Sequence, residues 1–186
     1  SALFGFFASI AVIIMGDQSG LYVYHAQPSK LVAIEGVWHT EKAPVGWSVL
    51  AWPDQKTHSN LFDVKIPYIG SLILTHDFTT DVKGADEIIA ENKVKIVQGQ
   101  QVLLQLEQFR KNPHDTSLVA QIQANSEYLG YGLLLKRYTD DLNNVTPQMI
   151  DQAAESTIPN MLPLYYSFRI MAFLGASFFV LFGIAA

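Results

Sequence analysis

A short helix is encoded by the stretch Gln27-Pro28-Ser29-Lys30-Leu31-Val32-Ala33-Ile34-Glu35-Gly36-Val37-Trp38. Pro28 favours the first turn of a helix, where its missing N–H would have no partner, and helix formers follow as far as Gly36. Lys30 and Glu35 are five positions apart, so their side chains point about 140° apart on this helix. Such a cation and carboxylate can bind a two-ended polar ring. The alternative is an amphipathic surface helix whose charges are solvated. The helix also carries an apolar ledge: Leu31, Ile34 and Trp38.

Charge is distributed unevenly along the 186 residues. Residues 2–15 contain no charged side chain, and residues 163–186 contain one, Arg169; the other eleven basic residues and all seventeen acidic ones lie within residues 17–155. A transmembrane helix needs about 20 apolar residues. The second apolar run is long enough to span, whereas the first indicates the last turns of a membrane helix. We therefore expect a mainly α membrane protein fragment, in which two partial transmembrane helices bracket a large helical extracytoplasmic loop.

The basic residues also predict the side of the membrane on which the loop lies. Lys30 is the first Lys or Arg after residue 15, and Arg169 is the only one in the last 25 residues. This scarcity argues against a cytoplasmic loop, because Lys and Arg are concentrated in loops that stay in the cytoplasm. A net charge of −5 argues against a nucleic-acid partner. The absence of Cys excludes disulfides and thiolate sites, and the five His lack zinc-enzyme spacing.

The loop divides into an irregular first part and a helical second part. We expect the turn-like cluster at residues 16–20 to end the first membrane helix, and residues 39–70 to be irregular, with short extended pieces at 64–66 and 71–74. The predicted divisions are 1–15 (end of a transmembrane helix), 16–79 (N-terminal part of the loop), 80–162 (helical C-terminal part of the loop) and 163–186 (start of a transmembrane helix).

Three helices are expected in the second part of the loop. The first covers residues 81–111, and its Gly99 costs about 1 kcal/mol. The second covers residues 116–136 and is interrupted at Gly130-Tyr131-Gly132. The third begins with Thr146 as N-cap and Pro147 in the first turn, and ends near residue 157. The stripe expected along the first helix is Val94, Val97, Gln101, Leu104 and Gln108, with Leu103, Leu106 and Phe109 adding apolar width.

Two residues of the last apolar run are candidates for chemistry. Arg169, one turn inside an apolar helix, is costly unless it reaches the interface or meets an anion. Met171 is by itself most simply a core-filling residue. An Arg paired with an anion beside a Met thioether is, however, a set that a buried haem with propionates uses.

Several stretches of this sequence together resemble subunit I of the cytochrome bd quinol oxidase family, in which the loop is the quinol-binding Q loop. The resemblance extends over nearly the whole chain, in the order of the family, and residues 80–160 suggest the long form of the loop. The stretches are GDQSG (16–20), KLVAIEGVW (30–38), IPY (66–68), LGYGLLLKRY (129–138), IP (158–159) and PLYYSFRIM (163–171).

The resemblance implies specific roles for four residues. Lys30 and Glu35 match the residues that serve quinol binding and oxidation. Met171 matches an axial ligand of the low-spin haem b iron, and Arg169 matches the Arg that stabilises the reduced form of that haem. The implied activity is that of a quinol:oxygen oxidoreductase of cytochrome bd type, catalytically incomplete as this fragment.

The resemblance also implies cofactors, partners and a location. High-spin haem b and haem d belong to the full subunit; the partners are ubiquinol or menaquinol, a second oxidase subunit, small subunits and membrane lipid. The location is the bacterial cytoplasmic (inner) membrane, with the loop on the periplasmic side. The chain departs from the enterobacterial pattern at Gln18, where that pattern has an acid, and at Gly36, where it has Ala.

The alternative function is a non-catalytic membrane protein with an extracytoplasmic partner-binding domain.

Overall fold

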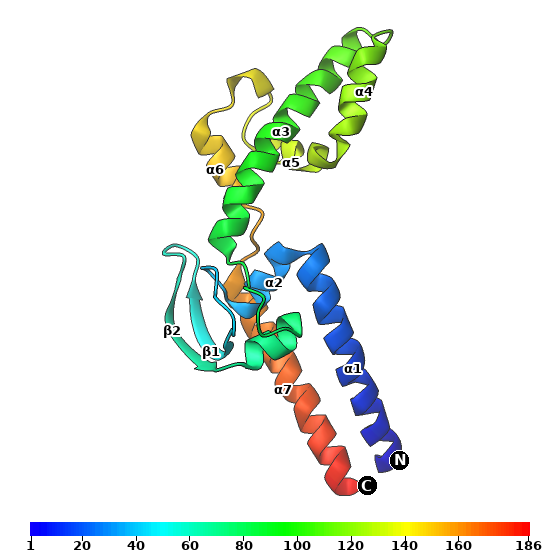
Figure 1. Ribbon diagram of the computed structural model, residues 1–186, viewed down its shortest axis with the longest axis vertical. Helices are drawn as coiled ribbons and strands as arrows, with labels where there is room; N and C mark the ends of the chain where they lie inside the picture. The colour runs from blue at the N-terminus through cyan, green and yellow to red at the C-terminus, as the bar shows by residue number, and fades with distance from the viewer. The chain divides into compact units, whose positions relative to one another are not determined.

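The computed structural model describes residues 1–186, apart from the side chain of Thr116. It consists of two compact units, one made of Ser1–Asp86 and Pro159–Ala186 and the other of Glu87–Ile158. Long apolar helices at both ends of the chain bracket a helical middle region, so the expected mainly α fold class is confirmed (Figure 1).

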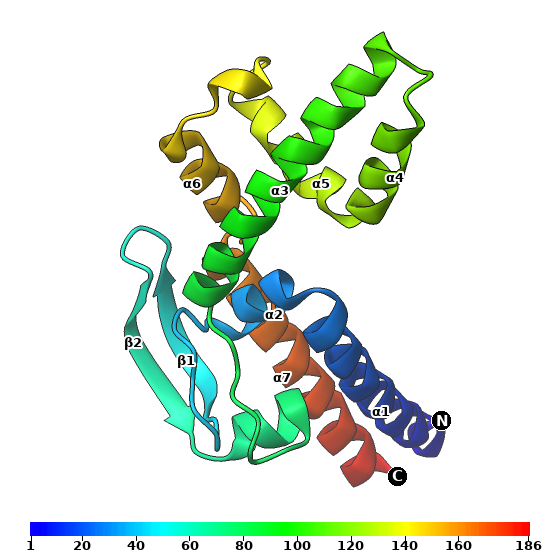
Figure 2. The ribbon, with the colours of Figure 1, turned by 45° about the horizontal axis from the view of Figure 1, so that its top comes forward.

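The two terminal helices, α1 (Ala2–Ala26) and α7 (Met161–Ala185), are each long and apolar enough to cross a membrane. They lie side by side and antiparallel, with both chain ends at the same end of the pair (Figures 1 and 2). The rings of Phe6 and Phe179 stack with centroids 5.2 Å apart. A Cβ on Gly5 would lie 2.8 Å from the ring of Phe182, so the absent side chain permits this approach.

The ends of the terminal helices differ from the sequence prediction. The cluster at residues 16–20 does not end α1, which continues to Ala26. Contacts from elsewhere in the unit support this extension: Asp17 pairs with His76, and Val23 and Tyr24 pack against buried residues of the loop. Tertiary contacts therefore override the local turn preference. Helix α7 begins at Met161, two residues before the expected start.

Helix α2 (Pro28–Glu35) follows the prediction closely. Pro28 stands in the first turn, and Gly36 caps the other end with a φ of +69°, donating its N–H to the carbonyl oxygen of Val32. A left-handed conformation of this kind favours glycine. Leu31, Val32 and Ala33 are buried, which fixes the helix in its unit.

The segment expected to be irregular contains an antiparallel hairpin of β1 (Trp47–Asp54) and β2 (Ser59–Ile66). The extended piece predicted at residues 64–66 is therefore confirmed as the end of β2. The piece predicted at residues 71–74 is wrong, because these residues belong to a short π-helix, η1 (Ser71–Thr75). The register of the hairpin is irregular between Ser48 and Leu50 and again between Ala51 and Pro53, which breaks the alternation that marks a strand.

The second unit is built mostly on α3 (Ala85–Lys111), whose end agrees with the prediction and whose start lies four residues later. The predicted interrupted second helix is a series of short helices, and the third, with Thr146 and Pro147 at its start, is confirmed. The elements are α4 (Thr116–Ala124), η2 (Ser126–Tyr128), α5 (Leu129–Leu133), η3 (Leu134–Arg137), η4 (Leu142–Asn144) and α6 (Pro147–Glu155).

Helix α3 buries a different stripe from the expected one. Val94 and Val97 are 59% and 40% exposed, whereas the buried positions include Ile88, Asn92 and Ile96. The reason for Gly99 is a close crossing with α5. A Cβ on Gly99 would lie 2.3 Å from the backbone nitrogen of Gly132, and a Cβ on Gly132 would lie 2.4 Å from the backbone of Gly99. The helix cost of Gly99 is thus offset by backbone-to-backbone packing.

Candidate functional site

The centre of the site is a buried ion pair between α2 and α7. Nη2 of Arg169 donates to Oε2 of Glu35 at 2.7 Å, across 134 residues of sequence. Nε of the same guanidinium donates to the backbone oxygen of Ser48 at 2.9 Å. The side chains of Glu35 and Arg169 are only 4% and 3% exposed. Because buried charges are costly unless they are paired and hydrogen-bonded, this contact fixes the end of α2 against α7.

Aromatic rings surround the guanidinium. The carbon Cζ of Arg169 lies 4.5 Å from the ring centroid of Tyr165, 4.8 Å from that of Trp47 and 5.5 Å from that of Phe168. The hydroxyl of Tyr165 donates to the same Ser48 oxygen, at 3.0 Å. Cation–π attraction adds to the ion pair where water is excluded, so the guanidinium is held from several directions.

Two donors at this site have no protein partner among the residues that the structure describes. They are Nη1 of Arg169 and Nε1 of Trp47, both buried. A buried donor without a partner costs about 1–3 kcal/mol. These two N–H groups belong to side chains that contact each other, and each could donate to an oxygen atom of a ligand.

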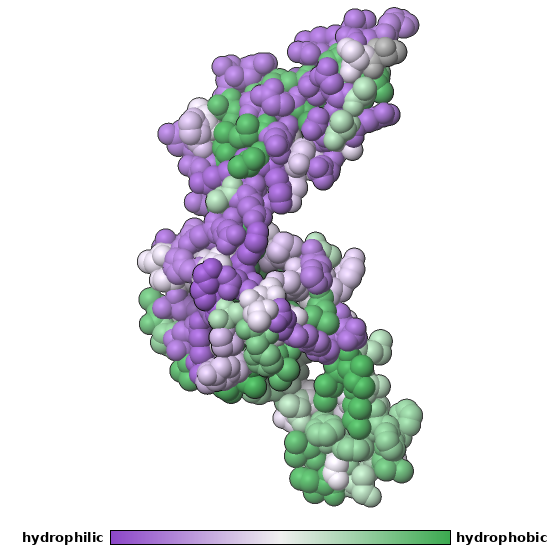
Figure 3. Space-filling model, viewed as in Figure 1, coloured by the Kyte–Doolittle hydropathy of each residue, from purple (hydrophilic) through white to green (hydrophobic). Residues whose placement is uncertain are grey.

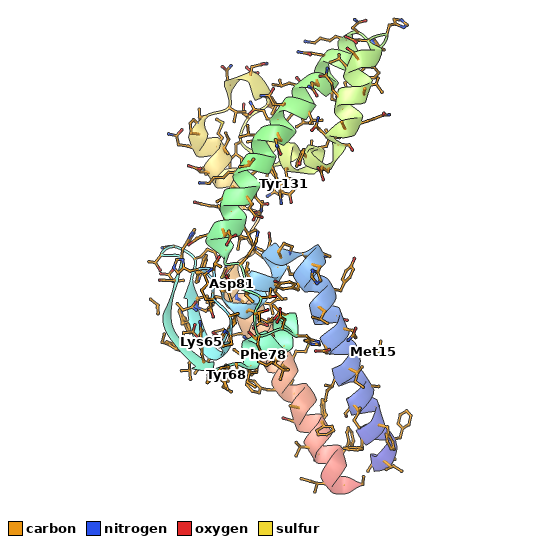
Figure 4. All side chains as sticks on the ribbon, in the orientation of Figure 1. Met15, Lys65, Tyr68, Phe78, Asp81 and Tyr131 are labelled. Carbon is orange, nitrogen blue, oxygen red and sulfur yellow. The ribbon has the colours of Figure 1, made fainter. Side chains whose placement is uncertain are left out.

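The hairpin side of the site carries its own charged network. Oγ of Ser48 donates to Asp63 at 2.6 Å, and the ammonium of Lys65 contacts both Glu41 and Asp63. Burial acts to lower the pKa of Lys65, but the hydrogen bonds and charges of Glu41 and Asp63 outweigh it and raise that pKa above its ordinary value. Lys65 thus stays charged and helps to hold β2 (Figure 4).

Lys30 lies apart from the ion pair. Its side chain is exposed on α2, and it forms no ion pair with any residue whose side chain is described. The structure thus joins Glu35 to Arg169 and leaves the Lys30 ammonium in solvent. Of the expected apolar ledge, Leu31 and Trp38 are 6% and 3% exposed and belong to the core, while Ile34 is half-buried.

Met171 lies on another face of α7 from Arg169. Two residues correspond to about 200° around a helix, and Met171 is 60% exposed where Arg169 is 3% exposed. An exposed thioether on an apolar helix fits an axial ligand of a haem that lies against that face. The guanidinium of Arg169 points instead toward Glu35 and Ser48, with Nη1 as its remaining donor.

Sequence reasoning missed three contributors to the site: Trp47, Ser48 and Tyr165. Tyr165 had a detectable signal, since it precedes Arg169 by four residues and therefore shares its face of the helix. Ser48 had none, because it acts through its backbone oxygen. Trp47 lies in a hairpin whose strand pattern is broken by bulges.

Comparison with known proteins identifies the family of this chain. A family model described as cytochrome bd terminal oxidase subunit I matches residues 1–186. The chain is 34% identical over 175 residues to cytochrome bd-II ubiquinol oxidase subunit 1 of Escherichia coli (strain K12), covering 94% of this chain and 34% of that protein. It is 30% identical over 87 residues to cytochrome bd ubiquinol oxidase subunit 1 of Bacillus subtilis (strain 168), covering 47% of this chain and 19% of that protein.

The chain therefore spans about one third of the length of the Escherichia coli relative and less of the Bacillus subtilis one. The match to the family model nevertheless extends from the first residue to the last, and it includes both apolar helices and the region between them. This chain belongs to the cytochrome bd terminal oxidase subunit I family.

Proposed function

We propose that this chain forms the quinol-oxidising region of a bacterial terminal oxidase. Membrane quinol, either ubiquinol or menaquinol, is oxidised at the periplasmic face, and its electrons pass through haem b to the oxygen-reducing haems. Membership of the cytochrome bd family supports this assignment, as do the two relatives, both of which are ubiquinol oxidase subunits. The observation that carries it is the buried Glu35–Arg169 pair, which joins the predicted quinol-binding helix to the predicted haem-binding helix.

Oxidation of a quinol releases two protons and two electrons, so the site needs a proton acceptor beside a ring hydroxyl. The carboxylate of Glu35 is that acceptor. Arg169 fixes its orientation through the 2.7 Å hydrogen bond and balances its charge before the proton arrives. Lys30, exposed on the same helix, binds a quinone oxygen as a mobile cation.

Two donors without a described partner would contact the quinone in this proposal. In this proposal a quinone oxygen accepts hydrogen bonds from Nη1 of Arg169 and Nε1 of Trp47, the two buried N–H groups that lack a described partner. This contact would hold the ring next to Glu35, since Arg169 touches both the ligand and the carboxylate.

Met171 would hold the low-spin haem b as an axial ligand from the other face of α7. When bound, the haem supplies a one-electron acceptor whose potential Met ligation raises. High-spin haem b, haem d, the second subunit and small subunits belong to the same proposal. Proton release on the periplasmic side, with proton uptake for water formation from the cytoplasm, would contribute to the proton gradient.

The test uses oxygen consumption by the intact membrane-bound oxidase. Glu35→Gln keeps the size of the side chain and removes the proton acceptor, so quinol-driven oxygen consumption should fall by at least about 10², while consumption driven by an artificial donor that bypasses the quinol site should persist. Glu155→Gln, the same change at an exposed helix position, should leave both rates unchanged. Equal loss with both donors in Glu35→Gln would contradict the proposed role.

A further inference from the structure

The first unit exposes apolar side chains beside the membrane helices. The segment from Ile66 to Thr75 contains no charged residue, and β2 leads directly into it. We call the following exposed side chains the interfacial patch: Ile66 (45% exposed), Tyr68 (59%), Leu72 (52%), Ile73 (38%) and Phe78 (51%). In a water-soluble protein, a continuous apolar patch of this kind marks a binding surface.

The two hydroxyl side chains of η1, Ser71 and Thr75, are hydrogen-bonded inside the protein. Oγ of Ser71 accepts from the backbone N–H of Val45 at 2.7 Å, and the N–H of Ser71 donates to the carbonyl oxygen of Val45 at 3.1 Å. The hydroxyl of Thr75 donates to the carbonyl oxygen of Ser71 at 3.0 Å. Ser71 and Leu74 are buried against the core while Leu72 and Ile73 are exposed, so η1 is apolar on its outer side as well. A short helix that is apolar on all sides belongs either in a core or in lipid.

The position of the segment along α1 indicates whether its outer side belongs in a protein core or in lipid. Nε2 of His76 lies 2.9 Å from Oδ1 of Asp17. Leu74 belongs to a buried cluster against which Val23 and Tyr24 of α1 pack. The segment thus lies beside α1 between residues 17 and 24, immediately beyond the uncharged run that ends at Met15.

Asp17 is the first charged residue of α1, and in a membrane-spanning helix the first charge and exposed Tyr side chains are typical of the headgroup layer, where Tyr and Trp are enriched. Tyr22 of α1 is 70% exposed here. Figure 3 shows apolar surface on the side of the loop nearest the terminal helices, and Figure 4 shows Tyr68 and Phe78 on the same part of the loop.

We propose that the interfacial patch is a lipid-binding surface, which rests in the membrane interface beside α1 with its apolar side chains among the headgroups and upper acyl chains. The hydrogen-bonded hydroxyl side chains of η1 allow this, because lipid offers no hydrogen-bond partners. The surface anchors the loop at the height where α2 and α7 form the Glu35–Arg169 pair. The inference requires that α1 and α7 cross the membrane, and it is independent of the proposed quinol chemistry.

The test places a nitroxide spin label at single Cys residues of the complete oxidase in lipid nanodiscs, in a background without other reactive thiols. The 186 residues contain no Cys to be removed. The variants are Tyr68→Cys, Ile73→Cys and, as a matched control, Leu61→Cys. Leu61 is 68% exposed on β2, near the turn at the other end of the hairpin. All three side chains are at least 38% exposed, so the substitutions remove little buried contact.

Collision rates with oxygen, which concentrates in lipid, and with a water-soluble nickel chelate are then compared. Labels at residues 68 and 73 should collide more often with oxygen, and the label at residue 61 more often with the chelate. If all three labels favour the chelate, the patch faces water and the inference is wrong. If residues 68 and 73 are shielded from both reagents, a protein surface covers the patch, and the inference is equally overturned.

Discussion

The guanidinium of Arg169 donates a 2.7 Å hydrogen bond to the carboxylate of Glu35, although the two residues are 134 positions apart in the sequence. Neither side chain is more than 4% exposed. Transfer of each charge out of water costs several kcal/mol, and this cost is offset by their mutual attraction, the hydrogen bond to Ser48 and the aromatic rings around the guanidinium. The pair therefore has two separable consequences: it holds α2 against α7, and it presents a paired carboxylate at the predicted quinol site.

Arg169→Leu should destabilise the protein by about 3–5 kcal/mol, because it leaves the carboxylate of Glu35 buried without its partner. Thermal unfolding of the purified oxidase, followed through the loss of native fluorescence, measures the change. The double variant Glu35→Gln/Arg169→Leu should be more stable than Arg169→Leu alone, since it contains no unpaired buried charge. If the second substitution brought no recovery, the two residues would not be energetically coupled.

Lys30→Gln should separate quinol binding from stability. The side chain of Lys30 is exposed and makes no ion pair with a described side chain, so the free energy of unfolding should change by less than about 0.5 kcal/mol. The KM for quinol should rise several-fold, because the variant loses a cation that binds a quinone oxygen. Steady-state kinetics with quinol measures this, and an unchanged KM would exclude Lys30 from binding.

Gly132→Ala should weaken the crossing of α3 and α5. The added Cβ would lie 2.4 Å from the backbone of Gly99, and such overpacking costs about 1–3 kcal/mol. Gly130→Ala, two residues earlier, meets nothing within 4 Å and should be neutral or stabilising by up to about 1 kcal/mol. Hydrogen exchange of the α3 and α5 amides reports the local opening free energy; equal protection in both variants would contradict the close crossing.

Asp81→Asn should give a pH-dependent loss of local structure. Hydrogen bonds from Lys42 (2.6 Å) and from the N–H of Ala43 (2.9 Å) lower the pKa of Asp81 below its ordinary value of 3.8. Because the pKa is lower in the folded protein, the Asp81 carboxylate stabilises the fold fully above pH 3.8. This stabilisation is lost as the pH falls through the lower pKa of the folded state.

Hydrogen exchange of the Ala43 amide tests this dependence. Its protection should be lower in Asp81→Asn than in the unchanged protein near neutral pH, and the difference should narrow as the pH falls below 3.8. Asp115→Asn changes an Asp in the other unit that also accepts from a backbone N–H, that of Ser117, and it should have no effect on Ala43. A difference that stayed constant with pH would show that charge on Asp81 is not involved.

Local signals in the sequence were sufficient for α2 and for the two apolar helices. Pro28 and Gly36 marked the ends of α2 because each has a backbone preference that acts without neighbours. The terminal helices were evident from composition, although the end of α1 was wrong, since contacts of Asp17 with His76 extend the helix beyond its polar cluster.

The features that the sequence could not predict depend on distant contacts or on irregular backbone. Bulges obscured the strand period of the hairpin, and the apolar residues of η1 looked extended because a short apolar run does not distinguish strand from helix. Glu35 and Arg169 were both singled out, but their pairing required the fold. Gly99 looked unfavourable until its neighbour Gly132 was known.

The central claim is that Glu35 accepts a proton from quinol at a site where Arg169 holds its carboxylate. The most direct measurement is the single-turnover rate of haem reduction after rapid mixing of the oxidised oxidase with quinol, in the unchanged protein, in Glu35→Asp and in Glu35→Gln. The account predicts that Glu35→Asp retains part of the rate of haem reduction by quinol, and that Glu35→Gln lowers this rate at least about 10²-fold. Haem reduction by an artificial donor should be unaffected in both variants. Reduction by quinol at the unchanged rate in Glu35→Gln would contradict the account.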